Sequence, residues 1–265
     1  MVPGSAYLPH GPSRHKDARP VLSLLRGRYR ARTAETAADL TAAQDLRTHC
    51  FRGPGGPRDA DAFDAICTHV LVEDIRSGTL VACFRLLPLT GGDEIARSYS
   101  AQFYDLAALS AYPGRMVELG RFCIHPDWHD ADILRVAWGA MTAYVDREGV
   151  EMLFGCSSFQ GTEAEGHLDA FAMLTEAHLA PKRWLPRVKA PNVYRFAQML
   201  ARNKPDARRA LRGMPPLLRT YLMMGGWVSD HAVVDPDLNT LHVFTGLEIA
   251  AIPPARARLL RAVAG

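Results

Sequence analysis

The sequence lacks the features that define several large classes of protein. Its five cysteines form no C-x-x-C pair, which disfavours both a zinc site and a disulfide framework: Cys50, Cys67, Cys83, Cys123 and Cys156. It has no uncharged apolar run of about 18 residues that would span a membrane. The first residues also lack the apolar segment of a signal peptide. We therefore predict a cytoplasmic protein with reduced thiols and no metal site.

Charge of one sign is not in large excess either. Lysine plus arginine is 31 and aspartate plus glutamate is 28, so the net charge of 31 − 28 = +3 is too small to indicate nucleic-acid binding. The charge is unevenly placed, because residues 182–219 hold eleven basic residues and one acid, and residues 14–32 hold seven and one. Two interpretations stay open for these stretches: a solvated surface, or a face that binds an acidic protein, a phosphate or a membrane headgroup.

What is present is ordinary globular composition. The 265 residues are 48% hydrophobic and 22% charged, enough to bury a core and typical neither of a disordered chain nor of a coiled coil. We predict a mobile basic leader at 1–27 and a single domain at 28–265. Within that domain we predict a basic insertion at about 182–219 and a C-terminal extension at about 215–250.

Hydrophobic periodicity predicts alternating strands and helices. Apolar residues at helical spacing predict helices over 36–51, 102–113, 133–149, 166–179 and 217–226. Runs rich in β-branched and aromatic residues predict strands over 29–33, 70–74, 80–88, 116–126, 151–159, 232–235 and 241–249. The second and third of these strands read as an antiparallel hairpin. The order strand, helix, strand over 116–159 predicts a βαβ crossover with neighbouring parallel strands.

The strand over 116–126 carries two charges in an otherwise apolar run. Strict alternation would put Glu118 on one face and Arg121, with Cys123, on the other. Burying either charge costs several kcal/mol unless it has a partner. The two charges therefore indicate either a structural ion pair, with Arg85 or Asp64 as partners, or a function.

Four spaced motifs, taken in order, resemble a known family. They are Arg47-x-x-x-Phe51, Asp61-x-x-Asp64, Arg85-Leu-Leu-Pro88 and Glu118-x-x-Arg121. This set resembles the signature shared by acyl-homoserine-lactone synthases and the N-acyltransferases of amino-acid-lipid synthesis, both of which use acyl-acyl carrier protein. The segments that begin at Asp61, Glu118, Phe154 and Pro215 closely resemble ornithine N-acyltransferases, and the resemblance covers roughly 30–250.

The resemblance implies an α/β (α+β) fold of the GCN5-related N-acyltransferase type, with a central mixed twisted sheet flanked by helices. It implies transfer of a (3-hydroxy)fatty acyl group from acyl carrier protein to the α-amine of ornithine or a related amino acid. The acyl-phosphopantetheine thioester is already activated, so we predict no other cofactor and no cysteine nucleophile. The product would be a single-chain lipid, which adds contact with an anionic membrane surface to the expected partners.

Site residues follow from this chemistry. We predict Glu118 and Arg121 as catalytic, with Glu118 the base that takes a proton from the acceptor amine. The predicted donor contacts are Phe122, Cys123, Ile124, Ser157 and Ser158, the first three through backbone N–H groups that would also stabilise the oxyanion. The predicted acceptor contacts are Arg47, Asp61, Asp64, Arg85, Asp230 and Asp235. Structural alternatives stay open: ion pairing for the arginines, capping for the serines and for the last two aspartates, and core packing for Cys123 and Cys156.

Two departures from the family patterns bear on the substrates. Acetyl-CoA-dependent members have a glycine-rich loop that binds pyrophosphate, where this chain has Asp130 and Asp132, so we predict carrier protein rather than coenzyme A. The basic stretch after Lys182 would suit an acidic carrier protein. His242 stands where the ornithine enzymes have an aspartate, which leaves a neutral acceptor such as glutamine open.

Two other functions compete with this interpretation. An acyl-homoserine-lactone synthase shares the motifs but generally ends before a region like 215–240. A non-catalytic module that binds carrier protein or membrane would keep the fold without the reaction. Loss of turnover on substituting Glu118→Ala would exclude the module.

Overall fold

A nine-stranded mixed sheet forms the centre of the computed structural model, which describes residues 22–264. All neighbouring strands are antiparallel except β6 and β7. The order across the sheet is β1 (Ser23–Arg26), β2 (Tyr29–Thr33), β3 (Thr68–Asp74), β4 (Thr79–Leu89), β6 (Met116–Ile124), β7 (Met152–Gln160), β11 (Thr240–Glu248), β10 (Trp227–Asp235) and β9 (Val193–Tyr194). Two short strands, β5 (Tyr104–Asp105) and β8 (Arg187–Val188), pair separately.

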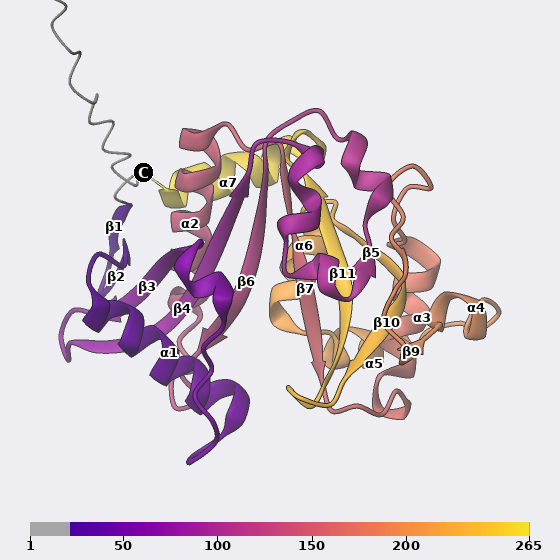
Figure 1. The fold of residues 1–265 in the computed structure, drawn as a ribbon, viewed down its shortest axis with the longest axis horizontal. Helices are drawn as coiled ribbons and strands as arrows, with labels where there is room; N and C mark the ends of the chain where they lie inside the picture. Colours follow the sequence, from indigo (N-terminus) through magenta and orange to yellow (C-terminus); the bar gives the residue numbers. More distant parts are fainter. Residues whose placement is uncertain (1–21, 265) are drawn as a thin grey trace, which may run out of the picture.

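The helices cover both halves of this sheet (Figure 1). They are α1 (Ala37–Arg52), α2 (Ala131–Glu148), α3 (Leu168–Ala177), α4 (Phe196–Met199), α5 (Ala207–Gly213), α6 (Pro216–Met223) and α7 (Pro254–Ala264). Short 3₁₀ turns are η1 (Ala62–Ala65), η2 (Gly92–Arg97), η3 (Ser100–Gln102), η4 (Ala107–Ala111), η5 (Glu165–His167) and η6 (Ile249–Ala251). Local chemistry sets the ends of the long helices. Thr36 and Asp39 form a capping box at the start of α1, and Gly149 ends α2 in a left-handed conformation.

Most predicted elements are confirmed, including the β3–β4 hairpin and the parallel pairing of β6 with β7. The predicted helix over 102–113 is wrong, because this segment is two 3₁₀ turns around the short strand β5. Tyr104 in that strand is buried against β11, and its hydroxyl bonds to the carbonyl of His242, so the chain is held extended there.

The two ends of the chain also differ from expectation. Most of the predicted leader, residues 1–21, lies outside the described residues, but Ser23–Arg26 form strand β1 instead of a mobile arm. Helix α7 was not predicted at all. Its sequence signal is Pro254 at the first turn, followed by alanine, leucine and arginine at helical spacing.

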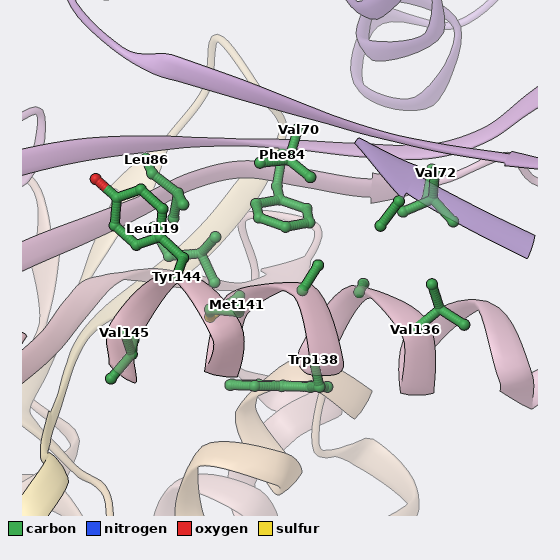
Figure 2. Packing of buried hydrophobic residues seen from close by; sticks show 14 of the residues in the cluster. Val70, Val72, Phe84, Leu86, Leu119, Val136, Trp138, Met141, Tyr144 and Val145 are labelled. Carbon is green, nitrogen blue, oxygen red and sulfur yellow. The ribbon is translucent and has the colours of Figure 1, made fainter. Parts of the chain in front are cut away.

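Helix α2 packs against one face of the N-terminal half of the sheet. Its residues Val136 and Met141 belong to the same buried cluster as Val70 and Phe84 of β3 and β4. Figure 2 shows Trp138 on the opposite side of α2, away from these strands. Trp138 is also buried, against Tyr221 of α6, so α2 is apolar on both of these sides. Within 22–264, no helix is long and apolar enough to cross a membrane.

Candidate active site

Strands β6 and β7 are paired at one end and diverge at the other (Figure 1). Their register runs only from Met116 opposite Met152 to Leu119 opposite Gly155. A Cβ at position 155 would lie 2.3 Å from the carbonyl oxygen of Leu119, so glycine permits the close approach at the last paired position. Beyond it a cleft of about 380 Å³ opens between the two strands. The divergence leaves backbone groups of both strands free to meet a ligand.

A β-bulge in β6 changes which side chains face this cleft. Cys83 of β4 pairs with Cys123, and Arg85 pairs with Gly120, so two residues of β6 oppose one of β4. Arg121, with φ of 51°, lies in the bulge. The prediction that Arg121 and Cys123 lie on the face opposite Glu118 is therefore wrong. The extra residue reverses the alternation, and these side chains share one face.

The Glu118 carboxylate is buried and lines the cleft. It accepts hydrogen bonds from the backbone N–H groups of Tyr99 and Ser100, both at 2.7 Å, and from the Ser100 hydroxyl at 2.6 Å. Burial raises the pKa of Glu118 above its ordinary value, against the opposing effect of the hydrogen bonds from Ser100 and Tyr99. The expected ion pair with Arg85 is not formed. Glu118 is instead a carboxylate held by neutral donors.

Below the cleft, three arginines and three aspartates form a buried ion network: Arg47, Arg85, Arg121, Asp59, Asp61 and Asp64. Arg47 of α1 is 1% exposed and donates to Asp59 and to Asp64, each at 2.7 Å. Buried charges are stable in this form because each is paired and hydrogen-bonded. Sequence reasoning missed Asp59, although its spacing to Asp61 and Asp64 was a signal.

The other two arginines connect this network to the cleft, which both of them line. Arg85 donates twice to Asp61, at 2.6 and 2.8 Å, and once to Asp64 at 2.8 Å. Arg121 donates to Asp59 at 3.1 Å and to Asp61 at 3.4 Å. Its guanidinium carbon lies 4.9 Å from the ring centroid of Tyr99, another cleft residue that sequence reasoning missed. The ion-pair alternative is thus confirmed for Arg121, with different partners.

The opposite wall comes from β10 and β11. His242 is 2% exposed, and burial lowers its pKa to about 3, so its imidazole is neutral at physiological pH. The Tyr104 hydroxyl is within 3.2 Å of its Nδ1, while its Nε2 has no hydrogen-bond partner among the described residues. Asp235 also lines the cleft and accepts from the backbone N–H groups of Asp237 and Leu238, which confirms turn capping. Asp230 lies outside the cleft, half-exposed, with its carboxylate on His231.

The predicted donor residues all line the cleft. Ser157 is buried and accepts a hydrogen bond from Thr245 at 2.9 Å, whereas the Ser158 side chain is exposed. The Sγ atoms of Cys123 and Cys83 are 3.6 Å apart in the core, and none of the five cysteines, all within the described residues, forms a disulfide. Core packing of Cys123 is therefore confirmed.

The fold thus brings most of the predicted site together and sets part of it aside. Around one cleft lie Glu118, Arg121, Arg85, Phe122, Cys123, Ile124, Ser157, Ser158 and Asp235. Arg47, Asp61 and Asp64 are not among the residues that line it. Asp64 joins Arg47 to Arg85, and Asp61 joins Arg85 to Arg121. The cleft combines a buried carboxylate of raised pKa, cationic groups and unpaired strand edges, which is suited to acyl transfer to an amine.

Comparison with known proteins agrees with this geometry. The acetyltransferase (GNAT) domain family matches residues 46–139. An L-ornithine N(alpha)-acyltransferase of Rhodobacter capsulatus is 34% identical over 239 residues, which cover 84% of this chain and 91% of that protein. One from Brucella abortus is 31% identical, over 85% of this chain and 86% of that protein. The solved structure of an N-acyl amino acid synthase from uncultured soil microbes has the same fold, with a TM-score of 0.50 at 10% identity over 84% of this chain and 93% of its own.

The length and level of this identity favour the acyltransferase over the non-catalytic alternative, and the predicted fold is confirmed. The chain is an acyltransferase, and it belongs to the family of L-ornithine N(alpha)-acyltransferases within the GNAT superfamily.

Proposed function

We propose that the protein transfers a 3-hydroxyacyl group from acyl carrier protein to the α-amine of ornithine. The amine nitrogen forms an amide bond with the thioester carbonyl carbon, the carbon–sulfur bond breaks, and the carrier thiol takes up a proton. The observation that carries the proposal is the buried Glu118 carboxylate at the point where β6 and β7 diverge, in a chain whose relatives are named for this reaction.

Glu118 serves as the base. The acceptor amine is mostly protonated near neutral pH and attacks only after losing a proton. Because burial raises the pKa of Glu118, its carboxylate takes that proton more readily than an ordinary glutamate would. Ser100 and Tyr99 hold the carboxylate in place without neutralising it. Arg121, which lines the same cleft, receives the acceptor carboxylate in this proposal.

The donor lies along the open edge of β6. Backbone N–H groups between Phe122 and Ile124 have no partner on β7, and they can hydrogen-bond the pantetheine arm and the oxyanion of the tetrahedral intermediate. The hydroxyl of Ser158 faces the same cleft from β7.

The start of α2 supports a carrier protein as donor. Asp130 caps the helix by accepting from the backbone N–H of Asp132, and it also accepts from the Tyr29 hydroxyl at 2.8 Å. A helix start occupied by two carboxylates does not attract the diphosphate of coenzyme A. Phosphopantetheine on a carrier protein has no adenosine diphosphate. The basic residues of 182–219 give an acidic carrier protein, or an anionic membrane that receives the lipid product, a complementary surface.

Asp235 is the acceptor contact on the opposite wall. It keeps a carboxylate in the cleft that can receive the side-chain ammonium of ornithine. Asp230, which lies outside the cleft, has no part in this. Glutamine is a second candidate acceptor, because His242 is neutral and adds no negative charge to this wall.

The test is mass spectrometry of the products formed by the purified protein with 3-hydroxyacyl carrier protein and an equimolar mixture of ornithine, glutamine, lysine and S-adenosylmethionine. We expect N-acyl ornithine, and N-acyl glutamine would identify the second candidate. A homoserine lactone would contradict the proposal in favour of the synthase alternative. Replacing the acyl carrier protein with the corresponding acyl coenzyme A tests the identity of the donor. Equal rates of acyl transfer from the two donors would contradict the preference for the carrier protein.

A further inference from the structure

Two segments of the chain expose only apolar side chains, glycine and arginine. They are residues 216–226, which include α6, and residues 249–264, which include α7. Neither segment holds an aspartate or a glutamate. We call the exposed residues of these two segments the α6–α7 surface. A face that meets only water usually carries mixed charges and polar side chains, so this composition indicates a partner.

The two segments lie side by side. The guanidinium Nη2 of Arg256 is 3.5 Å from the Met223 sulfur. Close by, a Cβ at Gly225 would lie 3.2 Å from the carbonyl oxygen of Ala251. At the other end of α7, the exposed Arg26 of β1 donates to the carbonyl of Ala262 at 2.9 Å and adds a further cation. The α6–α7 surface is therefore continuous.

The charges of this surface are all positive. They belong to four exposed arginines: Arg219, Arg256, Arg258 and Arg261. Among the described residues only the last of these forms an ion pair, with Asp146 of α2. The remaining arginines have no carboxylate of the chain to meet. The charge of the surface is thus complementary to an anionic partner.

Large apolar side chains project among these arginines. Leu259 is 62% exposed and Met223 is 51% exposed. At a lipid surface such side chains are buried below the headgroups, while the long arginine side chains extend to the lipid phosphates. A basic surface with projecting apolar side chains therefore fits a membrane better than it fits water.

The other basic stretch has a different surface. Within residues 182–212 the exposed side chains include uncharged polar groups and an acid, among them Asn192, Asn203 and Asp206. Such a mixture is typical of a surface that stays hydrated or meets another hydrated protein surface. The contrast separates a lipid-facing surface from one suited to an acidic protein.

Helix α6 connects the α6–α7 surface to the cleft. Pro216 at its start lines the cleft and is also exposed. Arg219 and Met223 follow on the same side of the helix, three and seven positions further along. The rise of 1.5 Å per residue makes the distance from Pro216 to Met223 roughly 10 Å. A lipid formed in the cleft is thus released close to this surface.

We propose that the α6–α7 surface docks on an anionic lipid bilayer, with Leu259 and Met223 among the headgroups and the arginines on the lipid phosphates. The choice of a membrane over another acidic partner rests on the proposed function, whose product is a single-chain lipid. The basic residues of 182–212 are then left for the carrier protein.

Sedimentation of the full-length protein with lipid vesicles tests this docking and needs no substrate. We expect binding to phosphatidylglycerol vesicles that weakens as the salt concentration rises, and little binding to phosphatidylcholine vesicles. No binding to the phosphatidylglycerol vesicles would overturn the proposal.

Matched variants locate the lipid contact. Leu259→Glu should lower the partition coefficient on phosphatidylglycerol vesicles about tenfold or more. Met199 of α4 is 63% exposed in the other basic stretch, so Met199→Glu is its control and should bind like the wild type. Arg258→Gln should weaken binding about fivefold, whereas Arg208→Gln on α5 should not. An equal loss in the control variants would overturn the assignment of the surface. Thermal melts check that all four variants fold.

The same variants distinguish other partners and the proposed function. Weaker binding of acyl carrier protein by Leu259→Glu, with unchanged vesicle binding, would assign the surface to the carrier protein. Loss of a dimer in sedimentation velocity would assign it to a second copy of the chain, and either result overturns the proposal. Acyl transfer without vesicles should be unchanged in all four variants. If the wild type binds vesicles as expected but transfers no acyl group, the proposed function fails while the docking surface stands.

Discussion

On the β6 side of the cleft, arginine and aspartate side chains are paired with one another, whereas on the β11 side polar atoms are left without partners. Arg47, which is 1% exposed, meets two carboxylates. Across the cleft, His242 Nε2 and the Thr240 hydroxyl have no hydrogen-bond partner among the described residues. The charged network is dense but not saturated, because Asp59 Oδ2 also has no hydrogen-bond partner among the described residues. Paired charges are suited to holding groups in place, and unpaired groups are suited to meeting a substrate. This difference supports the proposal that the β6 side positions the reacting groups and the β11 side contacts the acceptor.

The largest expected effect comes from removing the charge of Glu118 on the β6 side. Glu118→Gln should lower kcat by about 10²–10⁴ because the proton acceptor is lost. In the wild type, kcat should fall as the pH drops through the pKa of Glu118, which burial raises above that of an ordinary glutamate. That acidic limb should be absent in the variant. Steady-state kinetics over pH with saturating substrates check this.

Carrier-protein binding provides the control for Glu118→Gln, since binding should persist. An unchanged kcat would remove Glu118 from the proposed chemistry.

The next effect tests whether the charged wall is a scaffold. Arg47→Met should lower the free energy of unfolding by about 3–5 kcal/mol, because it leaves buried carboxylates unpaired. Burial by itself would raise the pKa of Asp64, but hydrogen bonds from Arg47 and Gln44 hold it well below its usual range. This stabilisation should therefore be complete above pH ~4 and be lost as the pH falls below it. Urea unfolding at several pH values measures both the loss of stability and its pH dependence. A loss under ~1 kcal/mol would contradict a scaffold role for the charged network.

The wall formed by β10 and β11 should also lose stability in acid, through His242. Burial lowers the pKa of His242 to about 3, with smaller contributions from His231 and Arg121, so the unfolded chain takes up the proton first. The full contribution of neutral His242 to stability is present above ~6.5, the pKa of histidine in the unfolded chain. About 2 kcal/mol of that stability is lost by pH ~5. His242→Gln should remove that part of the decline, as measured by urea unfolding at both pH values. An identical decline in the variant would show that His242 titrates normally.

The smallest effect is expected at the ion pair that joins the two halves. Arg52, at the end of α1, donates to Asp237 in the β10–β11 turn at 2.8 Å through each of two nitrogens. The aspartate side chain is 73% exposed, so Asp237→Asn should cost only about 0.2–1 kcal/mol. Thermal unfolding at low and high salt measures it. A loss of stability as large as that caused by Arg47→Met would contradict the expected difference between buried and exposed ion pairs.

The sequence predicted the elements better than it predicted the site. Capping residues and hydrophobic periodicity are local signals, which is why α1, α2 and the β3–β4 hairpin were found. The motifs with Glu118 and Arg121 identified one strand of the cleft. Tyr99 and Ser100, whose backbone N–H groups donate to the Glu118 carboxylate, come from a segment without a regular hydrophobic periodicity.

By itself, the sequence determined the order of strands and helices, the four motifs and the family they resemble, because these depend on residues near one another in the chain. Only the tertiary structure decided which charges meet. The bulge at Arg121 reversed the expected faces, and the network joined Asp59 to arginines of α1 and β6. Alternation along a strand cannot reveal an inserted residue, since a bulge becomes visible only against the partner strand.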